Sequence, residues 1–594
     1  MAVSRVSALV RLRDQAAGLA NVARRALAVS LLGLVLGGLA SLAATGFVFA
    51  VEWLNDVLWV SARSRMIHGD WRWLPWVTVA VLATGGLLVG LLNRYVLPGG
   101  RVHGPPDVIE VAQSGHGRLS LRAGLASAGA AIASLGAGAS VGQYGPLVHL
   151  GATLGSAIAR WMPAGGATLG TIGIGCGVAS AISTAFNAPI AGILFAHEVI
   201  LRHYSLKAFA PITVASTIGF VLTNFVFETR PLFRVNVVPE VAPAEFGAFI
   251  VLGILGALVA IAFMRAVILA GRLARASRLP VPFRPAAAGA ALGIMALWTP
   301  EVLGIGKETL RFAIIPEAFS AGELGLLLVA KIIATALCLG FGFAGGSFSP
   351  ALVIGALYGA LAGYVAAPLV PGAADSISVY AICGMAAVTS PVIGGPITTI
   401  LIVFELTRNY ELTTAVMVSV VFANLVSYRL FGRSMFDEAL RARGCDLTMG
   451  RDQLVLDHST IEAYITRHFV EAHPGESLGV LRDRLIAAEA TEAQLIDRER
   501  NYLGTITLSR LLVAIARAPN ATVDSIADWD DEALRVDTSI WEALKHAESN
   551  IGEMLPVLEK GDSNRIVGVI AQSVIVRAYR DTMYGIRREE HAAP

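Results

Sequence analysis

Four long apolar stretches without a single Asp, Glu, Lys or Arg decide what this chain can fold into. They cover residues 123–159, 161–197, 332–374 and 376–404. One membrane-spanning helix needs about 20 residues, so each stretch holds more than one helix with no charged loop between. Glycine and proline interrupt the stretches, and a broken backbone is tolerated at membrane depth only where it is buried or lines a cavity. We therefore expect an all-α polytopic membrane domain whose short or tilted helices meet inside the protein.

Composition and charge also indicate a membrane protein. Hydrophobic residues make up 55% of the 594 residues, and the mean hydropathy is +0.64. The net charge of +2 predicts no nucleic-acid partner. Arginines cluster before the first apolar run and after the last: Arg5, Arg11, Arg13, Arg24 and Arg25, then Arg429, Arg433, Arg441 and Arg443. The positive-inside rule then places both termini in the cytoplasm, and the Ala-, Gly- and Arg-rich composition is typical of a bacterial inner-membrane protein.

One short phrase occurs twice inside the apolar stretches. Its glycines, aromatic residue, proline and alanine have identical spacing in both copies: Gly142, Tyr144, Pro146, Gly151, Ala152 and Gly155 against Gly346, Phe348, Pro350, Gly355, Ala356 and Gly359. Two further segments, 176–179 and 189–198, recur at 383–386 and 396–405. The chain therefore contains two homologous halves, roughly residues 26–232 and 245–440. The sequence alone leaves open whether they are parallel or inverted.

The paired phrases have the chemistry of an anion site. A helix N-terminus presents unpaired N–H groups and a positive dipole end. Pro146 and Pro350 are natural early helix residues because they lack an N–H, and Gly145 and Gly346 let a backbone approach an ion closely. We expect two such N-termini, one from each half, to converge on a dehydrated anion. The alternative is that glycine and alanine serve only close helix packing.

From residue 445 onward the chain is charged and has no spanning run. It repeats a helix, a strand, a polar turn and a strand: 478–489, 493–497 and 503–507, then 540–549, 554–559 and 567–571, with the second turn at 561–564. This alternation predicts a small cytoplasmic α/β pair over residues 445–594, with halves at roughly 455–517 and 521–583.

Several motifs together resemble the CLC family of chloride channels and chloride/proton exchangers. Residues 346–350 match the family's G-x-F-x-P, residues 142–146 stand where the family has G-[RK]-E-G-P, and residues 102–106 take the place of G-S-G-I-P. The tail is similar to the paired cystathionine-β-synthase-type (CBS) domains that many members carry. The resemblance implies an inverted-repeat fold of about 18 helical segments over residues 26–444. It also implies a homodimer with one anion pathway per subunit. Residues 1–25, in which arginines are spaced along the chain, are predicted to be an amphipathic cytoplasmic segment.

Departures from the family pattern decide the predicted mechanism. The resemblance places Tyr144 at the exchangers' gating glutamate and Val199 at their internal proton-transfer glutamate. A phenol has an ordinary pKa near 10, so Tyr144 stays neutral and serves as a gate only by donating a hydrogen bond or by blocking the pore. Coupled proton transport thereby loses both relays. Glu198 is retained beside Val199, and its repeat partner Glu405 favours a structural, helix-end role for both.

The resemblance also implies which backbone groups would bind the anion. The N–H groups of Ser347, Phe348 and Ser349 would form the central site, and those of Tyr144 and Gly145 would form the outer site. No fixed cationic side chain is needed for this arrangement, because helix N-termini favour an anion by themselves.

Two side-chain ligands of the family are replaced in this chain. Phe436 takes the place of a tyrosine in the last membrane segment, and His103, which precedes Gly104, takes the place of a serine. The Tyr144 hydroxyl and the His103 ring are therefore the candidate side-chain donors. A solvated His103 would titrate near physiological pH, which predicts acid-modulated conduction. The alternative is a histidine near a helix end that bonds a carbonyl.

The tail predicts no bound cofactor. CBS-type nucleotide sites use G-x-x-[ST]-x-x-D, but the copy that begins at Gly504 ends at Arg510, and the copy that begins at Gly568 reaches Val574. Neither copy keeps the acid that bonds ribose, so a structural, dimer-bracing role is favoured over adenine-nucleotide binding. No metal site is expected either, because the pair at 197–198 lacks the second histidine of H-E-x-x-H.

These features predict a passive chloride-selective channel and not an enzyme. The rival hypothesis is a chloride/proton exchanger whose protons are rerouted through Tyr144, His103 and His197. A polytopic membrane enzyme is a third hypothesis, but the apolar stretches offer neither a nucleophile–base pair nor a metal constellation. The replaced serine and tyrosine leave the physiological anion open among chloride, other halides and nitrate.

Overall fold

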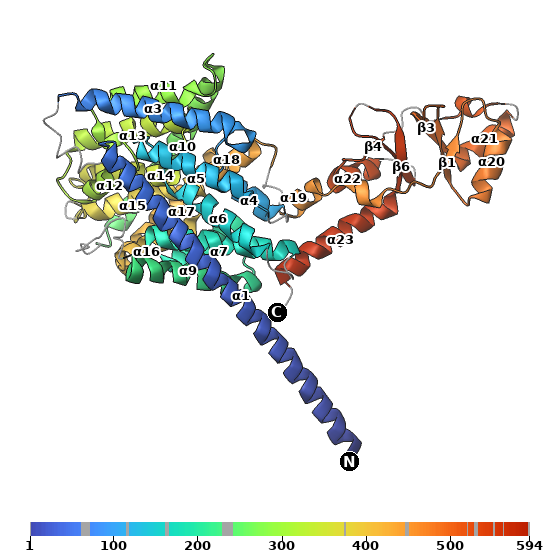
Figure 1. Cartoon of the computed structure of the whole chain (residues 1–594), viewed down its shortest axis with the longest axis horizontal. Helices are drawn as coiled ribbons and strands as arrows, with labels where there is room; N and C mark the ends of the chain where they lie inside the picture. The colour runs from blue at the N-terminus through green and yellow to red at the C-terminus, as the bar shows by residue number, and fades with distance from the viewer. Residues whose placement is uncertain are drawn as a thin grey trace. The chain divides into compact units, whose positions relative to one another are not determined.

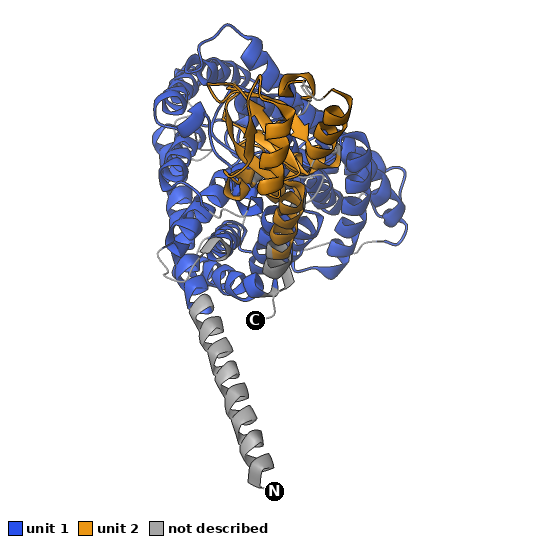
Figure 2. Cartoon of the chain, turned by 90° about the vertical axis from the view of Figure 1, so that its right-hand side faces the viewer, with its two compact units in different colours: residues 1–445, 593–594 blue, residues 446–592 orange. Residues whose placement is uncertain are grey.

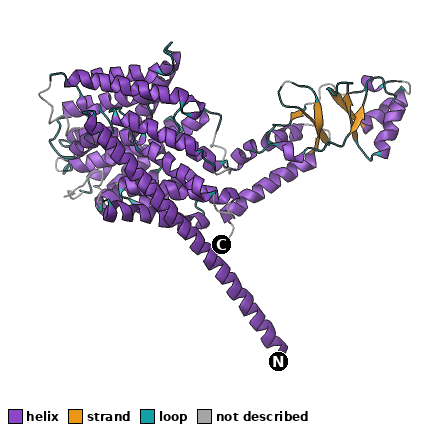
Figure 3. Ribbon diagram, in the orientation of Figure 1, coloured by secondary structure: helices purple, strands orange, loops and turns teal. Residues whose placement is uncertain are grey.

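The computed structural model describes residues 2–60, 72–114, 118–160, 166–227, 242–373, 376–445, 451–518, 521–527, 533–549, 553–561 and 563–591. The chain forms two compact units, residues 1–445 with 593–594 and residues 446–592 (Figure 2). The first unit is helical, and the second combines helices with short strands (Figure 3). The unit boundary falls next to the predicted one at residue 444. The predicted end of the first half, residue 232, lies outside the described residues.

The first half of the membrane unit runs from α1 to η3 (Figure 1). Its helices are α1 (Ala2–Val57), α3 (Leu74–Tyr95), η1 (Pro98–Gly100), α4 (Pro105–Gln113), α5 (Leu121–Gly136), α6 (Tyr144–Ala159), α7 (Gly166–Phe186), α8 (Pro189–Phe195), the π-helix η2 (Ala196–Leu201), α9 (Leu206–Val221) and the π-helix η3 (Leu222–Val226).

The second half repeats this order. Its helices are α10 (Glu245–Ala276), α11 (Phe283–Met295), η4 (Pro300–Val302), α12 (Lys307–Ile314), α13 (Ala321–Gly340), α14 (Phe348–Ala366), α15 (Ile377–Ile393), α16 (Pro396–Thr407), α17 (Tyr410–Leu430) and α18 (Met435–Arg441). Among the described residues, eight segments are long and apolar enough to cross a membrane. The predicted class, an all-α polytopic fold of two inverted halves, is confirmed.

The charge-free stretches break into separate helices at glycine and proline, as predicted. Helix α7 ends before Asn187, which has a φ of 58°, and α8 begins at Pro189. In the second half α15 ends before Gly394, whose φ is 71°, and α16 begins at Pro396. Proline fits the first helical position because its missing N–H would have no partner there. Equivalent breaks therefore fall at equivalent sequence positions.

Glycines in the repeated phrase bring helices into backbone contact. Helix α6 packs on α7, and α14 packs on α15 in the same way. A Cβ atom at Gly155 would lie only 1.9 Å from the carbonyl oxygen of Gly173, and one at Gly359 only 2.2 Å from that of Tyr380. Close packing thus explains the later glycines of the phrase, whereas the first glycine of each copy has a different role, described below.

The second unit contains two three-stranded sheets of the same design. Their strands are β1 (Val470–Ala472), β2 (Glu492–Ile496) and β3 (Tyr502–Thr507), then β4 (Leu534–Arg535), β5 (Met554–Leu558) and β6 (Ile566–Ala571). In each sheet the first strand is parallel to the second and the second is antiparallel to the third. The helices are α19 (Arg451–His458), η6 (Ile461–Tyr464), α20 (Leu478–Ala487), α21 (Leu508–Arg517), η7 (Val523–Ser525), α22 (Ile540–Ser549) and α23 (Gln572–His591).

The predicted repeat of the tail is confirmed, with boundaries that shift by one or two residues. Helix α22 coincides with the predicted segment 540–549. The parallel strands β1 and β4 were not predicted, because two or three residues are too short to show an alternating pattern. Part of the predicted turn at 561–564 lies outside the described residues. Each sheet packs its helices over a separate apolar core, which includes Leu481 and Leu495 in one half and Leu555 and Ile570 in the other.

Candidate anion-permeation site

Gly142 and Gly346, equivalent glycines of the two halves, meet backbone to backbone. The N–H of Gly142 donates to the carbonyl oxygen of Gly346 at 2.7 Å, and the N–H of Gly346 donates back at 2.8 Å. A Cβ at Gly142 would lie 2.7 Å from that carbonyl oxygen, so the contact requires glycine. This exchange between equivalent residues relates the two segments by a local two-fold axis.

Helices α6 and α14 begin immediately after this bridge. Gln143 is the N-cap of α6 and Ser347 is the N-cap of α14. Their carbonyl oxygens accept the first bonds of the two helices, from Leu147 and Ala351, at 3.1 Å each. The earlier N–H groups of each helix have no partner within the helix. The N-termini of α6 and α14, with their unpaired N–H groups, therefore lie next to each other in the apolar interior.

Tyr144 and Gly145 supply these early N–H groups in α6, and Phe348 and Ser349 supply them in α14. Proline follows at the third position of both helices and brings no N–H. The hydroxyl of Ser349 is also buried and has no hydrogen-bond partner among the described residues. Such groups, together with the positive ends of the helix dipoles, favour an anion.

A small cavity lies at the two helix tips. Its lining combines five of the predicted site residues with apolar neighbours: Tyr144, Gly145, Ser347, Phe348 and Phe436, with Pro105, Val148, Phe195 and Gly346. Its volume is about 10 Å³, roughly the space that one water molecule needs. The predicted residues therefore come together from α6, α14 and α18, around a space too small for a hydrated ion.

The Tyr144 ring fills the region beside this cavity. It stacks on Phe186 with ring centroids 3.9 Å apart and contacts Phe348 at 5.3 Å. Tyr144 is 1% exposed, and its hydroxyl has no hydrogen bond among the described residues, although Gln143 lies near enough to interact with it electrostatically. An unpaired buried hydroxyl is costly, and a bound anion would accept its hydrogen bond. Phe186 was not predicted as a site residue.

His103 bonds two protein acceptors in this structure. Its Nδ1 lies 3.2 Å from a carboxylate oxygen of Asp107, and its Nε2 lies 3.1 Å from the carbonyl oxygen of Pro98. The alternative of a histidine bonded to a carbonyl near a helix end therefore describes this geometry. The following residue, Gly104, donates its N–H to Asp107 at 2.8 Å and is the N-cap of α4. His103 and Gly104 do not line the small cavity.

His103 and Gly104 line a neighbouring vestibule of about 440 Å³, which also reaches Ser347 and Phe436. Four arginines line it as well: Arg101, Arg275, Arg284 and Arg443. The vestibule therefore carries a positive field next to the helix tips, which raises the local concentration of anions. Arg275 and Arg284 were not predicted, because the positive-inside rule already accounts for basic residues outside the spans.

Asp107 is the one carboxylate among the described residues that line the vestibule. Arg101 contacts it at 2.6 Å and Arg443 at 3.1 Å. Burial opposes its charge, but hydrogen bonds from His103 and Arg101 and the nearby charge of Arg443 outweigh burial and hold the pKa of Asp107 well below its ordinary value. Asp107 thus neutralises part of the arginine charge and leaves the vestibule positive.

Val199 stands at the position predicted to have lost the internal proton relay, and its side chain is buried in the π-helix η2. The neighbouring Glu198 carboxylate accepts from the N–H groups of Ile397 at 3.0 Å and Thr398 at 2.7 Å, and from the Thr398 hydroxyl at 2.6 Å. It therefore caps the N-terminus of α16, and the predicted helix-end role of Glu198 is confirmed.

His197, also in η2, is a fully buried imidazole. Its Nδ1 lies 3.0 Å from the carbonyl oxygen of His203, so Nδ1 carries the proton, and Nε2 has no partner among the described residues. It lines a cavity of about 520 Å³ together with Glu198 and Arg202. Nε2 is thus a proton-accepting atom that the anion site does not use.

Comparison of the sequence with known proteins assigns the family. The family model described as voltage gated chloride channel matches residues 85–428, and the CBS domain model matches residues 525–581. The chain belongs to the CLC family. A ClcB-like chloride channel protein of Ralstonia nicotianae is 30% identical over 425 residues, which are 70% of this chain and 96% of that protein.

Two solved CLC structures share the fold. The structure of a slow cyanobacterial Cl⁻/H⁺ antiporter matches with a TM-score of 0.62 at 22% sequence identity. The match covers 70% of this chain and 97% of the antiporter chain. The structure of a eukaryotic CLC transporter matches with a TM-score of 0.58 at 19% sequence identity, and the match covers 92% of this chain and 98% of the transporter chain. These likenesses establish the CLC fold, and the second extends it through the CBS pair. Members of this family transport anions across membranes.

Proposed function

We propose that this CLC protein is a passive chloride-selective channel, an uncoupled conductor in which Tyr144 is the gate. The observation that carries the proposal is the side chain at the tip of α6, which is a buried phenol with an unpaired hydroxyl. A phenol at that place donates one hydrogen bond to an anion but offers no carboxylate to exchange with chloride or carry a proton. Chloride would instead pass between N–H groups of α6 and α14 in a series of weak sites.

The absence of an ionisable group at Val199 supports the same conclusion. The adjacent carboxylate, Glu198, already bonds three donors of α16, and a proton on it would weaken that cap. Neither position therefore provides a free acid for proton transfer. The basic vestibule supplies anions to the helix tips without any coupling to protons.

Family membership and charge distribution support the assembly and the location. We infer a homodimer with one anion pathway in each subunit, embedded in a bacterial inner membrane with both termini in the cytoplasm. Chloride is the proposed physiological ion, while other halides or nitrate would meet the same N–H donors. The CBS pair would brace the dimer.

The experiment that tests the proposal is a flux measurement on purified protein in liposomes with an imposed pH gradient. For a channel, the reversal potential stays at the chloride equilibrium value at every pH gradient. For a coupled exchanger, it shifts with the pH gradient, and chloride efflux drives stoichiometric acidification of the liposomes. Either of the last two results would overturn the proposal.

His197 favours an exchanger as the second candidate function. Its buried Nε2 has no partner among the described residues, and His197 lines a cavity of about 520 Å³. It lies in the same π-helix as Val199, and π-bulges are frequent at functional sites. In that case protons would move through His197, His103 and Tyr144. Replacing His197 by Gln would abolish coupled proton movement in an exchanger and leave anion flux in a channel unchanged.

A further inference from the structure

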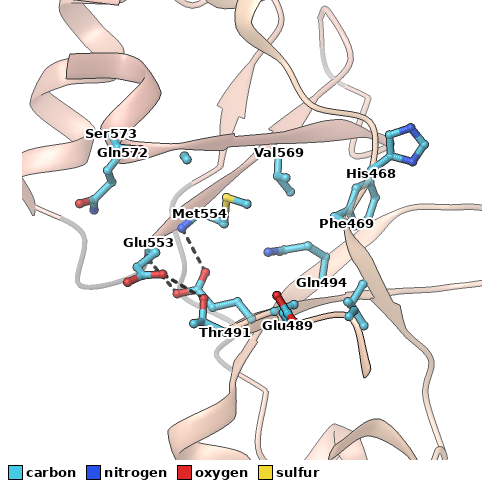
Figure 4. Close-up of a pocket in the computed structure, with 15 residues that line it drawn as sticks. His468, Phe469, Glu489, Thr491, Gln494, Glu553, Met554, Val569, Gln572 and Ser573 are labelled. Atoms are coloured by element: carbon cyan, nitrogen blue, oxygen red, sulfur yellow. Dashed lines mark hydrogen bonds between the residues drawn. The ribbon is translucent and has the colours of Figure 1, made fainter. Parts of the chain in front are cut away.

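Figure 4 shows a cleft in the tail, which does not suit an anion. Its volume is about 760 Å³, and its described lining includes Glu489, Glu492 and Glu553 but no lysine or arginine. Carboxylates on the lining would repel an anion. Fixed positive charge for the transported ion therefore has to come from the membrane unit.

Lys331, in α13, is a fully buried lysine of the membrane unit. Its side chain is 1% exposed, and no other lysine or arginine among the described residues is buried to this degree. An ionisable residue at membrane depth is costly and commonly serves function. The conduction path through the helix tips does not yet account for it.

The partners of Lys331 among the described residues are neutral. Its Nζ donates to the carbonyl oxygens of Val302 at 2.8 Å and Gly304 at 3.0 Å. The ion pair of the adjoining loop joins Lys307 to Glu52 at 2.9 Å and does not involve Lys331. A neutral donor would satisfy the two carbonyl groups with a smaller desolvation cost. The charge itself is therefore the unexplained feature, and in a medium of low dielectric constant its field reaches far.

The ammonium lies beside the segment that leads to the tip of α6. One of its two partners, Gly304, donates its N–H to the carbonyl oxygen of Gly138 at 2.8 Å. Thr335 follows Lys331 by one turn on the same face of α13, and its hydroxyl lies 3.1 Å from that of Ser140. The face of α13 that carries the ammonium thus packs on the residues immediately before the outer site.

The local two-fold axis shows on which side of the helix tips this charge lies. Ser127 in α5 is the counterpart of Lys331, at the same offset as the repeated phrases, and its hydroxyl accepts from the N–H of His103 at 3.2 Å. His103 belongs to the loop that borders the vestibule and leads to Gly104, the N-cap of α4, whereas Lys331 bonds the loop that leads to Gly306, the N-cap of α12. Because the halves are inverted, the two loops lie on opposite sides of the tips.

We propose that Lys331 is the fixed positive charge that stabilises the anion at the outer site, the N–H groups of Tyr144 and Gly145. It acts through its electric field and does not touch the ion, so it is a positioning residue. The vestibule arginines supply positive charge on one side of the helix tips, and Lys331 supplies it on the other. The proposal rests on the anion path through these tips and holds for a channel and for an exchanger alike.

The test is calorimetry of chloride binding to the full-length protein in detergent. Lys331→Gln keeps an N–H donor for the carbonyl groups and removes the charge, so it is expected to weaken chloride binding about tenfold or more. Lys331→Arg keeps the charge and should stay within about threefold of the unaltered protein. The loss in Lys331→Gln should persist when potassium gluconate raises the ionic strength, because salt screens a buried charge much less than an exposed one.

Two variants serve as controls. Lys307→Gln removes a lysine of the adjoining loop that is partly exposed and paired, and it should leave the affinity unchanged. Thr335→Val disturbs the contact with Ser140 without a change of charge, and it should also leave the affinity unchanged. Thermal unfolding of each variant checks its folding. If Lys331→Gln does not fold, Thr335→Asp replaces it, because a carboxylate one turn away neutralises the ammonium and should cause the same loss.

Two results would overturn the role of Lys331. One is unchanged chloride affinity in a folded Lys331→Gln variant, and the other is an equal loss in Lys331→Arg and Lys331→Gln, which would indicate a purely structural contact. Absence of chloride binding to the unaltered protein would overturn the anion path through the helix tips as well. The failure of this proposal and that of the proposed function therefore give different results.

Discussion

Glu198 and Glu405, equivalent residues of the two halves, each cap a helix of the opposite half. Glu198 bonds the N-terminus of α16, and Glu405 accepts from the N–H groups of Ile190 at 2.9 Å and Ala191 at 2.7 Å at the N-terminus of α8. Helices α8 and α16 also pack directly on each other. The same reciprocal relation joins Gly142 to Gly346. Two separate sets of reciprocal hydrogen bonds between equivalent residues therefore connect the halves, as a local two-fold axis between them requires.

Replacing either capping carboxylate by alanine is expected to destabilise the protein. Glu198→Ala or Glu405→Ala leaves two helix N–H groups without their charged acceptor, which costs about 1–3 kcal/mol. The measurement is thermal unfolding of the purified protein in detergent. The reciprocal geometry predicts losses of similar size from the two variants.

Glu308→Ala is the control for these caps. Glu308 pairs with Arg311 on an exposed face, where an ion pair contributes about 0–1 kcal/mol. Unfolding temperatures that fall no further for Glu198→Ala and Glu405→Ala than for this control would contradict the capping role.

The duplication made much of this fold predictable. A repeated phrase requires the same chemistry twice, so the convergence of two helix starts and the helix-end role of Glu198 could be expected from the sequence. The packing around the site could not. Every face of a helix such as α7 is apolar, and no amphipathic pattern indicates which face meets which partner. For this reason the stacking of Phe186 on Tyr144 had no signal in the sequence.

The vestibule could not be predicted from the sequence, for a different reason. Arg275 and Arg284 lie near the ends of different helices, and their joint position depends on how α10 and α11 pack. His103 could be assigned to the right region, but its bonds to Asp107 and Pro98 depend on a turn that the sequence does not specify.

Tyr144→Ala is expected to raise anion flux several-fold, because the ring occupies the space beside the 10 Å³ cavity. Tyr144→Phe keeps the ring and removes only the hydroxyl, so flux should stay low while anion affinity falls by about ten- to a hundredfold. Flux is measured in liposomes and affinity by calorimetry. Tyr358→Phe removes a buried hydroxyl that bonds Leu252 elsewhere and serves as the control. Unaltered flux in a folded Tyr144→Ala variant would remove Tyr144 as the gate.

Tyr144→Glu is expected to make flux depend on pH. An ionised carboxylate at this helix tip competes with chloride for the same N–H groups, and protonation releases them. Flux should therefore rise as pH falls, whereas the unaltered protein keeps a phenol that stays neutral over the same range. The measurement is liposome flux between about pH 4 and pH 8, a range that brackets the ordinary carboxyl value. A flat pH profile would count against Tyr144 as a pore residue.

Phe436→Tyr is expected to strengthen anion binding at the central site. Phe436 lines the small cavity with Phe348 and Tyr144, and a hydroxyl on its ring adds a donor toward the helix tips. One hydrogen bond to a charged group corresponds to about ten- to a hundredfold in affinity, which calorimetry with chloride measures. Phe431→Tyr, outside the cavity, is the control. Equal affinities for the two variants would show that the ring edge of Phe436 does not face the bound ion.

The arginines of the vestibule are expected to control how fast anions reach the helix tips. Arg275→Gln and Arg284→Gln each remove one positive charge from the 440 Å³ vestibule and should lower flux several-fold at low ionic strength. The difference should shrink near 1 M salt, where the screening length falls to about 3 Å. Arg278→Gln is the control, because Arg278 is exposed and does not line the vestibule. A loss of flux that is equal at low and high salt would indicate a structural defect and would contradict an electrostatic role for Arg275 and Arg284.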